Sequence, residues 1–300
     1  MSGRKIKSIK LSLLLLPFLA FIVLFSYIPL FGWSYAFLNF NPGLKIRDME
    51  FVGLHHFKEL FKYSGALRTV MTNTLSISFL SLTTSVLPVI LAILISQLPS
   101  KKLSRIVQSI TTIPNFISWV LVYAIIFSLF APDSGVVNQA LKSMGILKSP
   151  IDILGNVDGA WFIQIGIGVW KGLGWGAIVY LAAIAGIDQE LYESAVIDGA
   201  NRFQSTIHIT IPGIASTYLV LLLLGISSIL SNGFEQFWVF QNALTTDKLE
   251  VFDTYVYRLA MLKMRYSFST AMGMMKSIVS IMLLFIANQV SKKIRGESIV

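Results

Sequence analysis

The stretch DQELYESAVIDGANRFQSTIHITIP, residues 188–212, is a polar segment between two long apolar runs. It is the longest polar interruption beside an apolar run that still keeps a regular pattern. Asp188 is a suitable N-cap for a helix, and Glu190 and Glu193 would then lie near the helix N-terminus, where the helix dipole favours negative charge. Gly199 predicts the end of this helix.

A second helix is predicted after the glycine. Asn201 can cap it, and the isoleucines Ile207, Ile209 and Ile211 lead to Pro212. Proline is tolerated in the first turn of a helix, so Pro212 predicts the start of the next long apolar helix. The whole stretch is therefore expected to form a helix, a glycine turn and a second helix.

The composition of the 300-residue chain is that of a membrane protein. Apolar residues make up 55% and charged residues 13%, and the mean hydropathy is +0.72, whereas charged residues make up about 25% of a soluble domain. The absence of cysteine excludes disulfides, thiolate catalysis and cysteine-bound metals. The formal charge of +9 comes largely from short basic runs beside apolar segments, which are typical topology signals, so no nucleic-acid partner is expected.

Apolar runs along the chain predict six transmembrane helices, so the expected fold class is an all-α membrane protein. The predicted spans cover residues 11–31, 70–98, 106–130, 160–185, 213–230 and 270–290. Pro114 and Asn115 interrupt the third span. The first run follows basic residues, which leaves a signal peptide as an alternative, but the run is longer than the about 7–15 apolar residues of a signal peptide, so a retained span is favoured.

An amphipathic helix is predicted between the first two spans. In FVGLHHFKELF, residues 51–61, apolar side chains recur at helical spacing. His55 and His56 are adjacent and would point in different directions on a helix, so we expect an interfacial helix with solvated histidines rather than a metal site. The zinc pattern H-E-x-x-H does not occur in the chain.

An even number of spans places both termini on the same side of the membrane. Basic residues lie beside span ends at the N-terminus (Arg4, Lys5, Lys7 and Lys10), in the second-to-third loop (Lys101, Lys102 and Arg105) and in the tail (Lys292, Lys293 and Arg295). The positive-inside rule assigns these segments, and with them residues 188–212, to the cytoplasm. Residues 131–159 and 231–267 are then the large external segments.

Residues 188–212 resemble the cytoplasmic signature of binding-protein-dependent ABC importer permeases. The match consists of Glu193, Ser194, Ala195, Gly199, Ile209, Ile211 and Pro212, at the spacing of the family pattern E-A-A, G, I-x-L-P. Ser194 replaces the middle alanine and Ile211 replaces leucine, and both changes keep the shape class. Residues 192–204, 52–61 and 233–242 resemble the sugar-permease branch, especially permeases for complex oligosaccharides and polysaccharide fragments.

The resemblance implies the fold of a type I ABC importer transmembrane domain. In that family the cytoplasmic loop docks into a groove of the ATPase subunit, so Glu193 would anchor an ion pair and Gly199 would shape the docking helix. The residues expected to couple the chain to the ATPase are Glu193, Ser194, Ala195, Asp198, Gly199, Ile209 and Pro212. The implied partners are a second, different permease chain, two ATP-binding subunits, an extracellular solute-binding protein, membrane lipid and a sugar substrate.

The spans and the resemblance divide the chain into three parts. Residues 1–69 hold the first span and the external amphipathic segment, residues 70–289 form the five-span core with its cytoplasmic loop, and residues 290–300 form a cytoplasmic basic tail. The chain has no G-x-x-x-x-G-K-[ST] loop, so we expect it to be no enzyme and to bind no cofactor itself. ATP and Mg²⁺ would bind to the partner ATPase subunits. The expected location is the bacterial cytoplasmic membrane.

Candidate substrate contacts lie in the fourth span and the second external segment. Lys171 lies near the middle of its span, where charge is expensive and often functional, and would pair with an acidic sugar, an acid of another helix or carbonyl groups. Lys276 either lines the path or snorkels to the outer face. Aromatic rings stack on sugars and planar polar groups bind hydroxyls, so the candidate pathway residues are Trp170, Lys171, Trp175, Glu235, Gln236 and Trp238. Tryptophans also serve as interface anchors, which stays an alternative.

The function expected from the sequence is that of a permease subunit of an ATP-driven importer, forming the path for an oligosaccharide or a polysaccharide fragment. An ion-coupled secondary sugar transporter is an alternative, but it needs ion-coordinating groups in the spans, and few occur here. Two further alternatives remain. The chain could belong to the same importer class with a non-carbohydrate cargo, or it could be a scaffold or receptor subunit. The sequence does not identify the sugar, its length or its charge.

Overall fold

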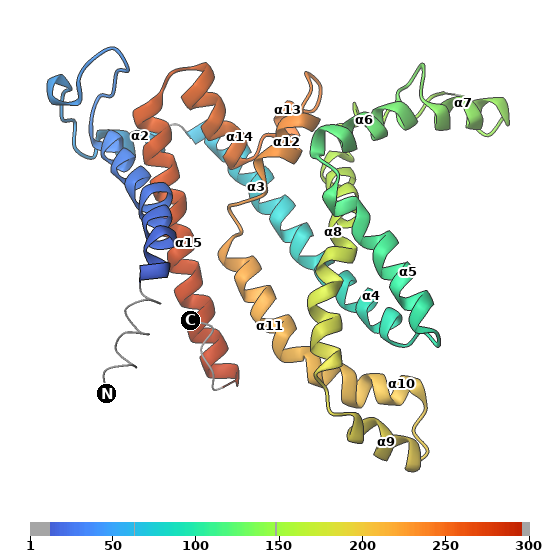
Figure 1. Ribbon diagram of the computed structural model, residues 1–300. Coiled ribbons are helices and arrows are strands. Elements are labelled where there is room, and N and C mark those ends of the chain that lie inside the picture. Colours follow the sequence, from blue (N-terminus) through green and yellow to red (C-terminus); the bar gives the residue numbers. More distant parts are fainter. Residues whose placement is uncertain (1–12, 63, 148, 296–300) are drawn as a thin grey trace, which may run out of the picture. The chain divides into compact units, whose positions relative to one another are not determined.

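The computed structural model describes residues 13–62, 64–147 and 149–295, which are mostly helical (Figure 1). The predicted basic cluster Arg4, Lys5, Lys7 and Lys10 and the end of the predicted tail, residues 296–300, lie outside the described residues. Within these described ranges, five helices are long and apolar enough to cross a membrane, namely Leu13–Phe37, Gly65–Ser96, Ala160–Ala185, Arg202–Ser227 and Tyr266–Lys293. A bent pair, Lys101–Phe116 and Trp119–Phe130, makes a sixth if counted as one span. The predicted all-α membrane fold is confirmed.

The chain divides into two compact units. One unit holds residues up to Leu67 with Tyr255–Ile278, and the other holds Arg68–Thr254 with the residues from Val279 onward. The first unit contains helix 13–22, the π-helical turn η1 (Val23–Tyr27), the 3-10 helices η2 (Ile28–Phe37) and η3 (Ile46–Asp48), α2 (His55–Lys62), the π-helical turn η6 (Arg258–Leu262) and the first part of α15 (Tyr266–Arg295). The most apolar window of the first span is not buried within the chain, as expected for a helix that faces lipid or another subunit.

Polar contacts hold the first unit together. Helix α2 is the predicted amphipathic helix, and it buries Leu60. Its Glu59 forms an ion pair with Arg265. Just after Arg265, the Ser267 hydroxyl donates to Leu38 O at 2.7 Å. These contacts join the segment after the first span to the start of α15.

The second unit holds most of the predicted core. It contains most of α3 (Ser64–Thr84), then α4 (Leu87–Ser96), α5 (Lys101–Thr112), the 3-10 helix η4 (Ile113–Phe116), α6 (Trp119–Phe130) and α7 (Val136–Ser143). The prediction of a basic loop after the second span is wrong in one respect. Lys101, Lys102 and Arg105 are already helical, because the Ser100 side chain caps α5 by accepting a hydrogen bond from Leu103 N.

The third span is more strongly bent than its sequence suggests. Helices α5 and α6 meet at 101°, whereas the sequence predicted one span interrupted at Pro114 and Asn115. Pro114 lies in the first turn of η4, where its missing N–H costs little. The bend comes later, at Ile117 and Ser118, which are extended, and Ser118 caps α6.

The central helix of the second unit is α8 (Ala160–Ala185). It packs against α4, α5 and α11 (Ile211–Ser227) (Figure 1). Gly174 permits the contact with α5, because a Cβ at this position would lie within 2.6 Å of Thr112 N. The absence of a side chain at Gly174 therefore allows α8 and α5 to pack closely.

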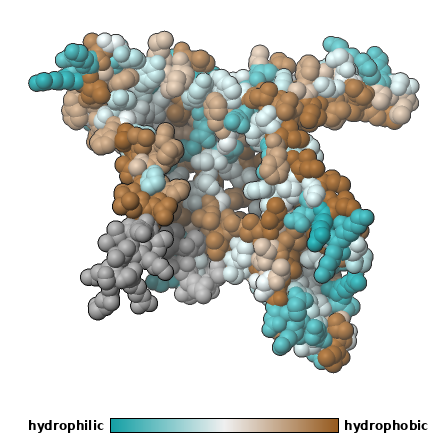
Figure 2. Space-filling view, viewed as in Figure 1, coloured by the Kyte–Doolittle hydropathy of each residue, from teal (hydrophilic) through white to brown (hydrophobic). Residues whose placement is uncertain are grey.

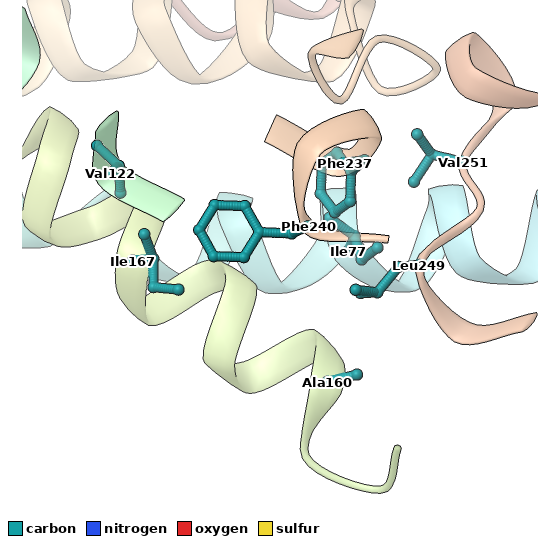
Figure 3. Close-up of a cluster of buried hydrophobic side chains, with 8 residues drawn as sticks. All are labelled: Ile77, Val122, Ala160, Ile167, Phe237, Phe240, Leu249 and Val251. Atoms are coloured by element: carbon teal, nitrogen blue, oxygen red, sulfur yellow. The ribbon is translucent and has the colours of Figure 1, made fainter. Parts of the chain in front are cut away.

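A hydrophobic core joins the membrane helices to the segments that were predicted to be external. α12 (Phe234–Phe240) and α13 (Thr246–Leu249) contribute to it, and the Phe240 ring points toward Val122 of α6 and Ile167 of α8 (Figure 3). On α3, Asn73 Nδ2 donates to the carbonyls of Asp247 (2.8 Å) and Glu250 (3.0 Å). The segment that contains Asp247 and Glu250 is thus fixed to α3, and it continues into α14 (Phe252–Tyr257).

The last helix, α15, is longer than its predicted span. It runs from Tyr266 to Arg295, so the described part of the predicted tail, which includes Lys292 and Lys293, prolongs the helix. Basic side chains near a helix C-terminus interact favourably with the helix dipole.

Candidate functional site

The polar stretch 188–212 forms the helical pair that its sequence predicts. Helix α9 (Gln189–Ile197) starts at Asp188, whose side chain accepts a hydrogen bond from Glu190 N at 3.0 Å. Gly199 ends the helix with φ +81°. The amide of Ala200 donates to Ala195 O at 2.8 Å and that of Gly199 to Val196 O at 3.1 Å, which satisfies carbonyls at the end of α9.

The second helix of the stretch is continuous with the next membrane span. Asn201 and Gln204 form a capping box at the start of α10 (Arg202–Ser205). A π-helical turn, η5 (Thr206–Thr210), then leads into α11. Pro212 lies in the first turn of α11 as predicted, but the helix does not break before it, because the π-helical turn shifts the hydrogen-bond register.

The surface of this helical pair is exposed and partly apolar. Ile197 is 85% exposed and Phe203 is 72% exposed, and Leu191 and Val196 are also exposed. In Figure 2 the end of the molecule that α9 and α10 form shows hydrophobic and hydrophilic residues side by side. An exposed apolar patch with a polar rim indicates a surface that another protein covers.

Several predicted coupling residues lie together in a groove between α9 and α10. The groove has a volume of about 320 Å³, and Ala195, Asp198, Gly199 and Ile209 line it. Glu193 and Ser194 lie outside the groove as exposed residues of α9, and Pro212 is exposed on α11. The Tyr192 hydroxyl and Thr210 Oγ1 are 2.9 Å apart, so α9 is tied back to the helix that follows.

Gly199→Val is expected to unfold the α9–α10 turn while the membrane helices stay intact. A left-handed conformation costs a residue with a Cβ about 1–2 kcal/mol, and a β-branched side chain tolerates it least. Hydrogen exchange of residues 189–205 should rise by at least about tenfold, since about 1.4 kcal/mol corresponds to a tenfold change. Gly199→Asn is the matched control, because asparagine adopts this conformation; equal exchange in both variants would argue against a conformational role for Gly199.

A second candidate site is a cavity between the membrane helices of the second unit. It has a volume of about 440 Å³, and α3, α8, α11 and α12 contribute to its lining. Residues on one face of α8, Gln164, Gly168 and Gly172, follow one another at intervals of four. The absence of a side chain at both glycines leaves space beside the helix, and this space is part of the cavity.

Polar side chains of α3, of α12 and of the segment before α12 line the cavity. Ser78 donates to Ile229 O, and Asn232 Nδ2 donates to Ser78 Oγ at 2.8 Å. Gln236 Nε2 donates to Gln164 O (2.9 Å) and Gln164 Oε1 (3.0 Å). Of the predicted pathway residues, Gln236 is the one that lines this cavity in the described part of the chain.

Lys171 lies beside the cavity, but its ammonium group forms hydrogen bonds with backbone carbonyls that do not line the cavity. Its side chain is 8% exposed, and Nζ donates to Asn115 O at 2.6 Å and to Pro114 O at 3.3 Å. Nζ also lies 5.3 Å from the centre of the Trp119 ring. The sequence suggested three kinds of partner for Lys171, and the structure shows one of them, the carbonyl groups. Lys171 therefore stabilises the turn between α5 and α6.

The remaining predicted pathway residues lie apart from the cavity lining. Trp170 is exposed and is two residues from both Gly168 and Gly172, which places it on the far side of α8. Trp175 is exposed and meets Phe116 edge-on. On α12, Trp238 stacks with Phe234 at 5.4 Å, and Glu235 is exposed.

The cavity is also lined by three polar residues that were not singled out from the sequence, namely Gln164, Ser78 and Asn232. Gln164 stands four residues before Gly168 and eight before Gly172, so one glutamine and two glycines on the same helix face were the available signal. Ser78 belongs to the serine- and threonine-rich second span, where sequence alone does not separate packing from lining. Asn232 follows the fifth span, and no pattern in the sequence marks it.

Comparison with known proteins agrees with this architecture. The family "Binding-protein-dependent transport system inner membrane component" matches residues 85–296. Protein LplB of Bacillus subtilis (strain 168) is 39% identical over 292 residues, which are 96% of this chain and 90% of that protein. The polygalacturonan/rhamnogalacturonan transport system permease protein YteP of the same organism is 37% identical over 292 residues, which are 96% of this chain and 89% of that protein.

A solved structure has the same fold. A chain in the crystal structure of a bacterial ABC transporter involved in the import of the acidic polysaccharide alginate superimposes with a TM-score of 0.86 and 35% identity, covering 97% of this chain and 99% of that chain. The family that residues 188–212 predicted is therefore confirmed. This chain belongs to the family of binding-protein-dependent transport system inner membrane components, the permease subunits of ABC importers.

Proposed function

We propose that the chain forms one half of the translocation path of an ATP-driven importer and that residues 188–212 couple it to the ATPase. The observation that carries this proposal is the connection of the exposed α9–α10 pair to the cavity. The pair follows α8 directly and continues into α11, and both helices line the cavity. A force on the loop would therefore act on two cavity walls.

The coupling residues keep the roles that the resemblance implies. Glu193 would anchor an ion pair with the ATPase subunit, and Ser194 lies exposed beside it. The groove formed by Ala195, Asp198, Gly199 and Ile209 would receive an ATPase side chain, while Pro212 starts the helix that transmits the movement.

The complete importer would contain a second, different permease chain, two ATP-binding subunits that hold ATP and Mg²⁺, and an external solute-binding protein. One related structure is a complex with an alginate pentasaccharide-bound periplasmic protein, which supports a binding-protein partner. We place the importer in the bacterial cytoplasmic membrane, with both termini and the α9–α10 pair in the cytoplasm. The unpaired membrane surface of the described chain supports a partner permease, because the most apolar window of the first span is not buried.

The proposed cargo is an oligosaccharide or a polysaccharide fragment. YteP is named for polygalacturonan and rhamnogalacturonan transport, and the related crystal structure is of an alginate importer. The cavity supports a saccharide cargo because it is lined by hydroxyl and amide groups together with the Trp119 ring. Trp170, Lys171, Trp175, Glu235 and Trp238 would act on the cargo only outside this cavity.

Cysteine cross-linking tests the docking of α9. The chain contains no cysteine, so Ile197→Cys introduces a single thiol at a position that is 85% exposed. We expect it to form a disulfide with a cysteine in the groove of the ATPase subunit when the transporter is assembled. Leu244→Cys is the control, because Leu244 is 64% exposed but lies between α12 and α13. Cross-linking at Leu244 and not at Ile197 would reject the proposal.

A further inference from the structure

The polar wall of the cavity contains two glutamines that are hydrogen-bonded to each other. Gln164 of α8 and Gln236 of α12 both line the cavity, although the two residues are only 3% and 9% exposed. Gln236 Nε2 donates to the backbone oxygen of Gln164 at 2.9 Å and to Gln164 Oε1 at 3.0 Å. The two side-chain amides therefore form one unit, which joins α8 to α12.

The backbone oxygen of Gln164 fixes the orientation of both amides. A carbonyl oxygen only accepts hydrogen bonds, so the atom of the Gln236 amide that faces it must be the nitrogen. The two hydrogens of this nitrogen are then used by Gln164, and Gln236 Oε1 lies on the other side of its amide. Because Gln164 Oε1 accepts from Gln236, Gln164 Nε2 also lies on the side of its amide that is turned away from the partner.

The paired amides keep one donor and one acceptor for a ligand. Gln164 Nε2 and Gln236 Oε1 have no hydrogen-bond partner in the described part of the chain. Neither belongs to the fully buried polar atoms that lack a partner there, so both retain access to the cavity that their side chains line. Gln236 Oε1 also lies beside Gly168 of the cavity lining, where an added Cβ would be 3.8 Å away. Asn232 Oδ1, in contrast, is fully buried and is out of reach of a ligand.

We propose that Gln164 and Gln236 bind two neighbouring hydroxyl groups of one sugar ring of the cargo. One hydroxyl accepts a hydrogen bond from Gln164 Nε2, and the other donates to Gln236 Oε1. Each hydroxyl has one hydrogen and two lone pairs, so a vicinal diol satisfies both amide atoms, whereas a carboxylate only accepts and would satisfy the donor alone. The inference rests on the proposed function and adds the chemical group of the cargo that this pair recognises.

The diol contact does not depend on the charge of the saccharide. A uronate ring carries neighbouring hydroxyls in addition to its carboxylate, so neutral and acidic sugars both offer the group. The wall also includes Trp119, whose indole N–H is a further donor. The Lys171 ammonium lies 5.3 Å from the centre of the Trp119 ring and takes no part in the glutamine pair, because it donates to the carbonyls of Pro114 and Asn115.

Gln164→Met removes the free donor but preserves one hydrogen bond of the pair. Methionine has a similar length and no N–H, and Gln236 Nε2 can still donate to the backbone oxygen at position 164. Ile163→Met is the matched control, because it introduces the same side chain on the same helix at a residue that does not line this cavity. The measurement is the equilibrium affinity of the complete transporter, with its partner permease and ATPase subunits, for two free probes.

The first probe is an oligogalacturonate with free hydroxyls at O2 and O3, and the second is the same oligomer methylated at both oxygens. Methylation removes the two hydroxyl hydrogens and places a methyl group between each oxygen and the wall. We expect the wild type to bind the first probe at least about fivefold more tightly, a difference of about 1 kcal/mol. Gln164→Met should weaken binding of the first probe by about the same factor and change that of the methylated probe less than about twofold. Ile163→Met should preserve the wild-type ratio.

An effect that is confined to the free-hydroxyl probe separates a direct contact from a structural role, because a distorted wall would weaken both probes alike. Equal weakening of both probes by Gln164→Met overturns the inference. Equal affinity of the wild type for the two probes also overturns it, and this comparison needs no variant. Uptake of the unmodified probe is measured separately in proteoliposomes that also contain the binding protein. Uptake without a difference between the probes rejects the diol contact alone, whereas the absence of both uptake and binding rejects the proposed saccharide transport.

Discussion

Replacing Gly174 by valine is expected to leave little folded protein in the membrane. Gly174 of α8 faces the backbone of α5, and a Cβ there would lie within 2.6 Å of Thr112 N and closer still to the Thr111 carbonyl. Backbone atoms cannot rotate away as a flexible side chain can, so the two helices must separate. We expect destabilisation at the upper end of the about 1–3 kcal/mol that overpacking costs.

The measurement is the yield and the thermal unfolding midpoint of the purified protein in detergent. Gly166→Val is the matched control on the same helix, because a Cβ at Gly166 would meet no heavy atom of the described chain within 4 Å. The control is expected to behave like the wild type. Equal loss of stability in both variants would show that valine disturbs α8 wherever it stands, and would contradict a special contact at Gly174.

The helical pair of residues 188–212 was predictable because its information is local. Asp188 and Asn201 cap helices through side chains a few residues away from the amides that they bind. Glycine is favoured at position 199 because the φ angle of this residue is positive. The spans were predictable for a related reason, since the hydropathy of a window of residues decides whether it crosses a membrane.

Features that depend on distant partners were not predictable from the sequence. Pro114 marked an interruption of the third span, but the 101° bend follows from the extended residues Ile117 and Ser118. The sequence favoured a path-lining role for Lys171, because a charge inside a span is expensive, and it could not tell which partner removes that cost. The structure places the carbonyl of Asn115 at 2.6 Å from Nζ, and that carbonyl is 56 residues away in the chain.

The second span shows why lining and packing are difficult to separate. This span is rich in serine and threonine, and the hydroxyl of Ser78 donates to Ile229 O. The same residue also lines the cavity. A hydroxyl has one hydrogen and two lone pairs, so one side chain can stabilise the helix contact with its hydrogen and present an acceptor to the cavity.

Glu193→Lys is expected to uncouple ATP hydrolysis from transport. Glu193 stands on α9 among exposed apolar side chains, which include Leu191, Val196 and Ile197. When an ATPase subunit covers this surface, the carboxylate loses water and depends on its ion-pair partner. Loss of one partner of a buried interfacial charge pair costs about 2–5 kcal/mol, and reversal of the charge adds repulsion.

The direct measurement of this coupling is ATP-driven uptake and ATP hydrolysis in the same proteoliposomes, each holding the assembled transporter. Glu50→Lys is the control, because Glu50 is exposed and makes the same change of charge outside residues 188–212. We predict that Glu193→Lys lowers uptake by at least about tenfold and removes the stimulation of hydrolysis by loaded binding protein, while Glu50→Lys preserves both. Full uptake with normally stimulated hydrolysis in Glu193→Lys would contradict coupling through residues 188–212.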